Sequence, residues 1–338
     1  MKKIVVAYRF EPGEEALAIM RDVARVVILE NDSEELLLRE IKDADTLLIG
    51  ITPRVTRTLI ASAPRLKHVA RQGVGVDIVD LSAATDRGIL VTNVPDVTSN
   101  SVAEFAMTLL LSMAKNIIHC DIAVKRGQWG QRRELIRTNV ELNNKTHGIV
   151  GLGRIGRRVA VRCQAFGMRV LYYKRNRDLD FERSTDVTYV PFETVLQASD
   201  SISLHLPLTP ETTNLIDTPQ FEMMKQGVLL VNHSRGTVVN EKALVQALED
   251  GTIGGYGTDV YEQEPPDPAG KLLSFSNVIA SPHLGGGTIE ARRRANRIVA
   301  EDVASVIRGQ LPRNLVNREV LEAEFRIGDE QSSNVSQV

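Results

Sequence analysis

The sequence has few aromatic residues, two cysteines and almost no net charge. Aromatic residues make up 4% of its 338 positions, and 41 basic residues against 43 acidic ones leave a formal charge of −2 without a basic stripe. We therefore expect no nucleic-acid partner and no anionic membrane surface as a partner. Cys120 and Cys163 form no CxxC pair and no ligand cluster, so we expect free thiols, no metal site and a reducing compartment.

Long hydrophobic runs are also missing. The N-terminal segment MKKIVVAYRF is apolar for only a few residues, which is too short for a signal peptide and predicts a first strand. No segment approaches the roughly 18 apolar residues that a membrane helix needs. The expected location is cytoplasmic.

What the sequence does contain is a regular alternation of strand-like and helix-like segments. KIVVAY, RVVIL, DTLLIG and LKHVAR alternate with helical patterns in the first ninety-odd residues, and a second series begins at THGIVGLGRIG. This alternation predicts α/β architecture with two Rossmann-like, doubly wound parallel sheets. Between the series, residues 100–127 predict one long helix that is apolar nearly all round, which favours burial between domains or subunits.

The second series opens with a glycine-rich turn. A strand ends at Gly151, Gly153 and Gly156, and a helical pattern follows directly. In a dinucleotide-binding fold, the first glycine makes the turn, the second admits the pyrophosphate and the third allows close helix packing. The alternative is a glycine-rich turn without a ligand.

The residues after the next strand indicate which dinucleotide binds. An acid that binds the ribose hydroxyls is expected there, but the sequence has Tyr173, Lys174, Arg175, Asn176 and Arg177. Cations suit a 2′-phosphate, so NADP(H) is favoured over NAD(H). Two alternatives stay open: a solvated basic loop, or a loop that returns Asp178 or Asp180 to the ribose.

Three further polar residues each follow a predicted strand of the second series. They are Arg235, Glu264 and His283, about fifty residues apart from first to last. Strand carboxyl ends share one edge of a parallel sheet, so the three side chains can converge. Reduction of a 2-keto acid needs a cation for the carboxylate and a proton donor for the carbonyl oxygen; Arg235 and a His283 held by Glu264 suit these roles. Taken alone, His283 would more often be a surface residue.

These features together resemble the D-isomer-specific 2-hydroxyacid dehydrogenase family over nearly the whole chain. The motifs that carry the resemblance are RQGVGVDIVD (71–80), SVAEFAM (101–107), KTHGIVGLGRIG (145–156), LHLPLTPET (204–212), NHSRGTVVNEKAL (232–244), GTDVYEQEP (257–265) and SPHLGGGTIEA (281–291). Seven motifs in order are far more specific than any single one.

The resemblance implies a domain arrangement and a set of site residues. A substrate-binding domain (1–99 plus 290–338) would carry an inserted dinucleotide-binding domain (100–289), and the chain would form a homodimer through the latter. Arg235, Glu264 and His283 would be catalytic, and the backbone around Val74 and Gly75 would bind the substrate carboxylate together with Arg235. Besides the three glycines, the implied cofactor contacts are Arg154, Ile155, Tyr173, Lys174, Arg175, Leu206, Pro207, His233, Ser234, Asp259 and Gly285.

The sequence departs from the family pattern in three places. Lys174 stands where NAD-preferring relatives carry an acid, which supports NADP(H). GITPRVT lacks the arginine that phosphoglycerate-type members have near Gly50, although Arg54 lies close by. Asn240 replaces a common Asp, a change that we expect to be structural.

The leading functional hypothesis is a glyoxylate or hydroxypyruvate reductase that acts on a small 2-keto or 2-hydroxy acid. A D-3-phosphoglycerate dehydrogenase-like enzyme is the alternative within the class. A dinucleotide-sensing corepressor-like binding protein is the alternative outside it, disfavoured because only about the last dozen residues look loose.

Overall fold

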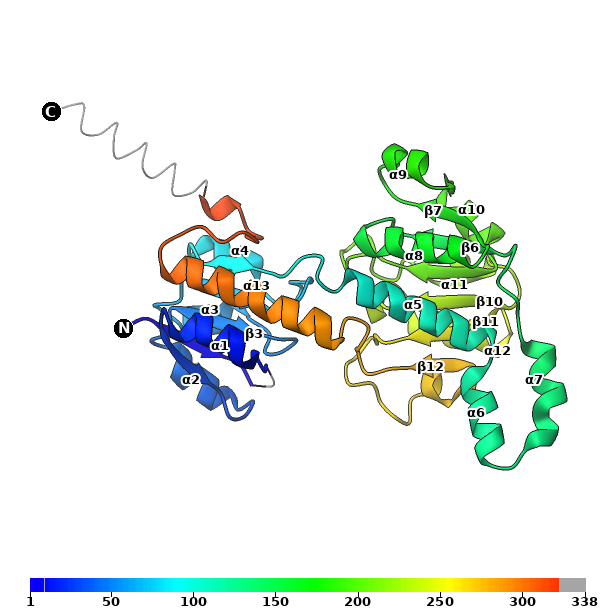
Figure 1. Cartoon of the computed structure of the whole chain (residues 1–338), viewed down its shortest axis with the longest axis horizontal. Helices are drawn as coiled ribbons and strands as arrows, with labels where there is room; N and C mark the ends of the chain where they lie inside the picture. Colours follow the sequence, from blue (N-terminus) through cyan, green and yellow to red (C-terminus); the bar gives the residue numbers. More distant parts are fainter. Residues whose placement is uncertain (9, 322–338) are drawn as a thin grey trace. The chain divides into compact units, whose positions relative to one another are not determined.

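The chain folds into two compact units. The computed structural model describes residues 1–8 and 10–321; the loose C-terminal residues expected from the sequence lie outside this part. One unit contains Met1–Thr98 and the chain from Ile289 onward, and the other contains Ser99–Thr288 (Figure 1). The first unit is thus built from both ends of the chain.

The first unit is built on a five-stranded parallel sheet with the order β2-β1-β3-β4-β5. Its strands are β1 (Lys3–Val6), β2 (Arg25–Ile28), β3 (Thr46–Ile49), β4 (His68–Arg71) and β5 (Leu90–Thr92). Its helices are α1 (Gly13–Arg21), α2 (Glu34–Ile41), α3 (Arg57–Ala61), α4 (Leu81–Asp86) and α13 (Ile289–Ile307).

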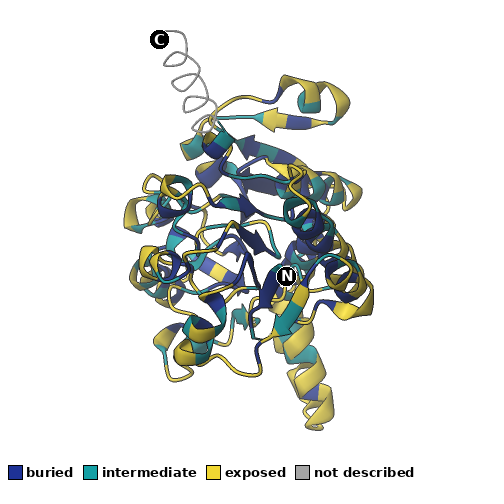
Figure 2. Cartoon of the chain, turned by 90° about the vertical axis from the view of Figure 1, so that its left-hand side faces the viewer, coloured by how far each residue is buried: buried dark blue, intermediate teal, exposed yellow. Residues whose placement is uncertain are grey.

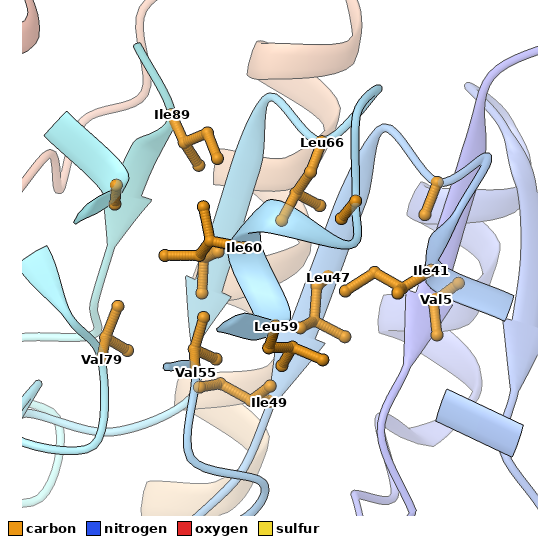
Figure 3. Close-up of a cluster of buried hydrophobic side chains, with 14 of the residues drawn as sticks. Val5, Ile41, Leu47, Ile49, Val55, Leu59, Ile60, Leu66, Val79 and Ile89 are labelled. Atoms are coloured by element: carbon orange, nitrogen blue, oxygen red, sulfur yellow. The ribbon is translucent and has the colours of Figure 1, made fainter. Parts of the chain in front are cut away.

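Successive residues of each strand face opposite sides of this sheet. Val5 belongs to a buried cluster that includes residues of α2, α3 and α4, whereas its neighbour Ile4 belongs to a cluster with α1 and α13. Figure 3 shows Leu59 of α3 beside Leu47 and Ile49 of β3. Burial on both faces explains why these strands are continuous apolar runs.

The second unit is built on a seven-stranded parallel sheet with the order β12-β11-β10-β9-β6-β7-β8. Its strands are β6 (Thr146–Val150), β7 (Arg169–Tyr173), β8 (Val187–Tyr189), β9 (Ser201–Leu204), β10 (Val228–Asn232), β11 (Ile253–Thr258) and β12 (Val278–Ala280). The two parallel sheets confirm the predicted fold class. Strand order reverses between β6 and β9, and doubly wound sheets bind ligands at such a point.

Helices cover both faces of the second sheet. They are α5 (Ser99–Ala114), α6 (Ile117–Lys125), η1 (Trp129–Gln131), α7 (Arg132–Thr138), α8 (Arg154–Ala165), α9 (Leu179–Ser184), α10 (Phe192–Ala198), α11 (Thr218–Glu222), η2 (Gly236–Val238), α12 (Glu241–Glu249) and η3 (Lys271–Ser274). One core lies under α5 and α8, and the other lies under α10, α11 and α12. Burial therefore concentrates in the strands, with exposed residues on the outer helix surfaces (Figure 2).

The single long helix predicted over residues 100–127 is wrong. α5 ends at Ala114, Asn116 adopts a left-handed conformation with φ 48°, and α6 starts at a bend of 60°. Asparagine tolerates this conformation, and its Nδ2 donates to Thr138 Oγ1 at 3.0 Å. As a result α5 packs into the core, whereas α6 lies mostly exposed with η1 and α7 (Figure 1).

Within the part of the chain that the structure describes, no single helix is long and apolar enough to cross a membrane. α5 and α6 reach that length and hydropathy only as a bent pair, and most of α5 is buried in the core.

Candidate active site

The glycine-rich turn connects β6 to α8 at the point where the strand order reverses. Gly151 has φ +100°, and a Cβ there would lie 2.5 Å from the carbonyl oxygen of His205. A Cβ at Gly156 would lie 2.4 Å from the Gly151 carbonyl oxygen, so α8 approaches the turn closely. A Cβ at Gly153, the N-cap of α8, would meet no heavy atom within 4 Å. The turn thus leaves open space at the amino end of a helix, a geometry that suits a pyrophosphate.

The next two turn residues begin α8. Arg154 is exposed and Ile155 is half-buried, with Ile155 packed against the core under α5 and α8. The exposed guanidinium of Arg154 therefore lies beside the helix end that suits an anion.

The basic loop after β7 folds back on itself. Asp178 is buried, caps α9 through the Phe181 N–H, and accepts hydrogen bonds from Arg157 and, at 3.4 Å, from Lys174. Burial raises the pKa of Asp178, but the hydrogen bonds from Arg157 and Phe181 and the charges of Arg157 and Lys174 together hold the pKa below its usual value. The carboxylate therefore stays charged and partly neutralises the ammonium group of Lys174.

The remaining charges of this loop are arranged differently. Arg177 pairs with Glu182 at 2.7 Å, and the exposed Asp180 pairs with Arg183. Arg175 is exposed, and Tyr173 is half-buried with its ring 5.5 Å from that of Phe192. Arg175 is consequently the most accessible cation directly after β7.

The predicted acid–base pair is brought together by two loops. Glu264 follows β11, His283 follows β12, and Oε2 of Glu264 lies 2.8 Å from Nδ1 of His283. His283 has φ 53°, and its N–H donates to the Ser281 carbonyl in a tight turn. Both side chains are more than one-third exposed, so they remain accessible to a small molecule.

Arg235, which follows β10, is held close to this pair. A Cβ at Gly236 would lie 1.9 Å from the Tyr261 carbonyl carbon, so the loop after β10 packs directly on the loop after β11. The Tyr261 N–H donates to Glu264 Oε1 at 3.2 Å, and its hydroxyl donates to the Ser281 carbonyl at 2.9 Å. Tyr261 thus ties together the three loops that carry Arg235, Glu264 and His283.

The charges in this site act on one another. The hydrogen bond with Glu264 raises the pKa of His283 above its ordinary value, against the opposing effects of burial and of Arg235. Burial raises the pKa of Glu264, but the His283 hydrogen bond and the charges of His283 and Arg235 bring it below the usual range. The pair therefore favours a carboxylate beside an imidazole that holds its proton, as a general acid requires.

A hydrogen bond between Asp259 and Gly285 links the loops after β11 and β12, which also carry Glu264 and His283. The Gly285 N–H donates to Asp259 Oδ2 at 2.7 Å, whereas the buried Asp259 Oδ1 has no hydrogen-bond partner among the residues that the structure describes. Burial raises the pKa of Asp259, and the Gly285 hydrogen bond opposes that shift. A buried acceptor without a partner suits an amide donor, such as a carboxamide.

The other predicted contacts follow β9 and β10. Leu206 and Pro207 come after β9, while His233 and Ser234 are buried directly after β10. Sequence reasoning missed His205, whose ring centroid lies 4.7 Å from that of His233. The signal was present: SISLH places polar residues at every second position of an otherwise apolar strand.

Val74 and Gly75, the predicted carboxylate contacts, lie in the first unit after β4. Val74 is 42% exposed, and its carbonyl accepts a hydrogen bond of 2.7 Å from Asn93 Nδ2. The preceding Gly73 carbonyl accepts from the Val94 N–H. These bonds hold an exposed loop to the segment that follows β5.

Asn240 also has an assignable role. Its side chain caps α12 by accepting hydrogen bonds from the N–H groups of Lys242 and Ala243. This contact confirms the structural role expected for the position.

The fold and site define a dinucleotide-binding dehydrogenase with a histidine–carboxylate pair. A model of the D-isomer specific 2-hydroxyacid dehydrogenase NAD-binding domain matches residues 107–285, and the chain belongs to that family. It is therefore an oxidoreductase with a nicotinamide cofactor, acting on the CH–OH group of its donor.

Individual relatives agree with this assignment. The chain is 42% identical over 290 residues to a glyoxylate reductase from Korarchaeum cryptofilum, which covers 86% of this chain and 87% of the relative. It is 42% identical over 305 residues to a D-3-phosphoglycerate dehydrogenase from Methanocaldococcus jannaschii, covering 90% of this chain but 57% of the relative. A D-lactate dehydrogenase from Aquifex aeolicus, solved with NAD and lactic acid, superimposes with a TM-score of 0.85 at 30% identity, covering 94% and 99% of the two chains.

Proposed function

We propose that this chain reduces small 2-keto acids of the glyoxylate and hydroxypyruvate type to D-2-hydroxy acids, with NADPH preferred. The observation that carries the proposal is the 2.8 Å contact between His283 and Glu264, in a site that also holds the cation Arg235. Relatives named glyoxylate reductase, at about 40% identity over most of the chain, support the substrate class.

The three side chains divide the reaction between them. Arg235 binds the substrate carboxylate and polarises the keto group. In the first unit, we propose the backbone around Val74 and Gly75 as a further carboxylate contact. His283 gives the proton on Nε2 to the carbonyl oxygen, while Glu264 holds Nδ1 and stabilises the charged ring. When bound, a reduced nicotinamide would supply a hydride to the carbonyl carbon. The π bond of the C=O group is then replaced by one C–H bond and one O–H bond, and His283 regains its proton from solvent.

The second unit fits the cofactor. The open space at Gly153 and the amino end of α8, with Arg154 and Ile155, suits the pyrophosphate, and the partnerless Oδ1 of Asp259 suits the nicotinamide carboxamide. Leu206, Pro207, His233, Ser234 and Gly285 complete the proposed contacts. We accordingly propose residues 100–289 as the dinucleotide-binding domain. Residues 1–99 together with 290–338 form the proposed substrate-binding domain.

The preference for NADPH rests on the loop after β7. Arg175 is exposed and would pair with a 2′-phosphate, and Lys174 and Tyr173 precede it in the sequence as further proposed contacts. Asp178, the first carboxylate after β7 in the sequence, is buried and already engaged by Arg157, so it is poorly placed to bind ribose hydroxyls. NADH remains the alternative cofactor.

We also propose that two copies associate through a helical arm formed by residues 117–138. Ile117, Val124, Trp129 and Ile136 on this arm are each more than half exposed. An apolar surface of this kind on a projecting element favours burial against a partner, and a second copy offers the same surface. The cytoplasmic location of the protein remains a prediction from its composition.

A spectrophotometric screen tests the proposal. Oxidation of NADPH and NADH is followed with glyoxylate, hydroxypyruvate, phosphohydroxypyruvate and pyruvate, and His283→Ala serves as the control variant. We expect fastest turnover with glyoxylate or hydroxypyruvate and NADPH, and a loss of about 10²-fold or more in His283→Ala with cofactor binding retained.

Other outcomes of the screen contradict particular parts of the proposal. Preference for phosphohydroxypyruvate would favour the D-3-phosphoglycerate dehydrogenase-like alternative. The exposed Arg54 would then be the candidate partner for the substrate phosphate. Cofactor binding without turnover of any acid would favour the corepressor-like binding protein. Equal rates in the parent and His283→Ala would remove His283 from the mechanism.

A further inference from the structure

A row of polar side chains crosses the otherwise apolar core of the second unit. Ser201 and Ser203 of β9 are each 1% exposed, and His205 follows them at the same period of two. The intervening Ile202 and Leu204 belong to the core on the opposite face. The polar row therefore lies on the face of the sheet that α5 and α8 cover.

His147 of the neighbouring strand β6 links this row by hydrogen bonds. Its Nδ1 lies 2.7 Å from Ser201 Oγ, and its Nε2 lies 2.8 Å from Ser203 Oγ. Ser203 Oγ also lies 2.8 Å from Nε2 of His205. Ser201, His147, Ser203 and His205 thus form one continuous chain, which we call the β9 relay.

The β9 relay couples the two imidazoles. Burial lowers the pKa of His147 to about 4 and that of His205 well below its ordinary value, so both rings are neutral at neutral pH and carry one proton each. The Ser203 hydroxyl has one proton, and His147 and His205 are its only side-chain partners among the described residues, so it donates to one ring while accepting from the other. In either arrangement the two rings hold opposite tautomers: when His147 is protonated on Nε2, His205 is protonated on Nδ1, and the reverse.

His205, at the end of this relay, lies between two cofactor-binding turns. Its N–H donates to the Val150 carbonyl at 2.8 Å, and its own carbonyl occupies the space beside Gly151 that a Cβ would need. Its ring contacts that of His233, with centroids 4.7 Å apart and planes at 50°. The same residue therefore contacts the glycine-rich turn and the turn that carries His233 and Ser234.

We propose that His205 is a positioning residue for the nicotinamide cofactor, and that the β9 relay fixes its ring so that the Gly151 and His233 turns keep their spacing. The inference rests on the assignment of these turns to the cofactor and is independent of the identity of the 2-keto acid. His205 acts here through the backbone segments on either side of it.

Ser203→Ala tests the inference because it removes the shared hydroxyl without adding bulk. Ser199→Ala is the matched control: Ser199 is fully buried just before β9, and its hydroxyl donates to the Val195 carbonyl outside the relay. The first readout is the dissociation constant of NADPH and of NADH, from the fluorescence of the reduced nicotinamide. The second is the tautomer of each histidine, from ¹⁵N NMR of the imidazole rings.

The expected result has three parts. The parent shows opposite neutral tautomers for His147 and His205, and Ser203→Ala abolishes this opposition. Both cofactors bind about tenfold more weakly to Ser203→Ala than to Ser199→Ala, because the Gly151 and His233 turns, no longer held by a fixed His205 ring, must be ordered when the cofactor binds. At saturating cofactor and substrate, kcat changes by less than about threefold, because the relay contacts no reacting atom.

Identical tautomers for His147 and His205 in the parent would overturn the relay. Equal cofactor affinity in Ser203→Ala and Ser199→Ala would overturn the positioning role. If Ser203→Ala does not fold, Ser201→Ala removes the far end of the relay, and the same comparison applies with a smaller expected change. Neither readout needs a 2-keto acid, so failure of the substrate assignment alone leaves this test intact.

Discussion

The Nδ1 atom of His283 lies 2.8 Å from Oε2 of Glu264, so the carboxylate occupies one of the two ring nitrogens. This contact is also the largest cause of the raised pKa of His283. Both observations support the proposed role of His283 as the proton donor.

Glu264→Gln is expected to shift the pH profile of keto-acid reduction. Reduction needs a protonated imidazole, so its rate falls as pH rises through the pKa of His283. Removal of the carboxylate charge lowers that pKa, so the fall moves to lower pH. The measurement is kcat/KM for reduction as a function of pH, and superimposable profiles would show that Glu264 does not set the pKa.

Lys174→Asp is expected to shift cofactor preference toward NADH, because it removes a phosphate partner and adds a repulsive charge. Arg175→Ala should also lower the ratio of NADPH to NADH kcat/KM, since Arg175 is the more accessible cation. Arg183→Ala is a control, because Arg183 is an exposed cation on α9 paired with Asp180. An unchanged ratio in both test variants would mean that other residues bind the ribose.

Val124→Asp is expected to produce monomers. Val124 is 60% exposed on the arm, and a charge there would have to be buried without a partner in the dimer. Gln131→Asp places the same charge at an exposed polar position of the arm and should leave the dimer intact. Light scattering after gel filtration gives the mass, and a monomeric parent would refute the proposed association.

His233→Gln is expected to reduce the sensitivity of the protein to acid. Burial lowers the pKa of His233 to about 4, so between about pH 6.5 and that value the unfolded chain binds a proton that the folded chain does not. The free energy of unfolding therefore decreases as the pH is lowered through this window, by at most about 1.4 kcal/mol per pH unit from this group.

The measurement for this prediction is the denaturant midpoint at neutral pH and at mildly acidic pH. The parent should lose more stability than His233→Gln between the two conditions. An equal loss in both proteins would show that His233 does not contribute. The comparison between variants cancels the carboxylates that titrate in the same range.

The sequence was sufficient for the fold class and for the contact between Glu264 and His283. Each of these residues lies in the loop after a short strand, and the carboxyl ends of neighbouring parallel strands lie at the same edge of the sheet. The glycine-rich turn was also predictable, because the positive φ of Gly151 and the close approach of Gly156 to the Gly151 carbonyl are local features.

Other features depend on contacts that the sequence does not display. The bend after α5 requires Asn116 in a left-handed conformation and a hydrogen-bond partner at Thr138. The spacing of apolar residues reveals neither of these features. Asp178, a candidate ribose ligand in the sequence, pairs in the structure with Arg157, twenty-one residues earlier in the chain. The β9 relay joins two strands that are distant in sequence, so the serines of SISLH resembled ordinary strand residues.

The most direct test of the account is the fate of a labelled hydride. Hydroxypyruvate is incubated with the enzyme and NADPH that carries deuterium at both C4 positions of the nicotinamide, and the glycerate is analysed by mass spectrometry and chiral chromatography. The account predicts D-glycerate with one deuterium on C2. L-glycerate, or glycerate without deuterium on C2, would contradict direct hydride transfer to a face of the substrate fixed by Arg235 and His283.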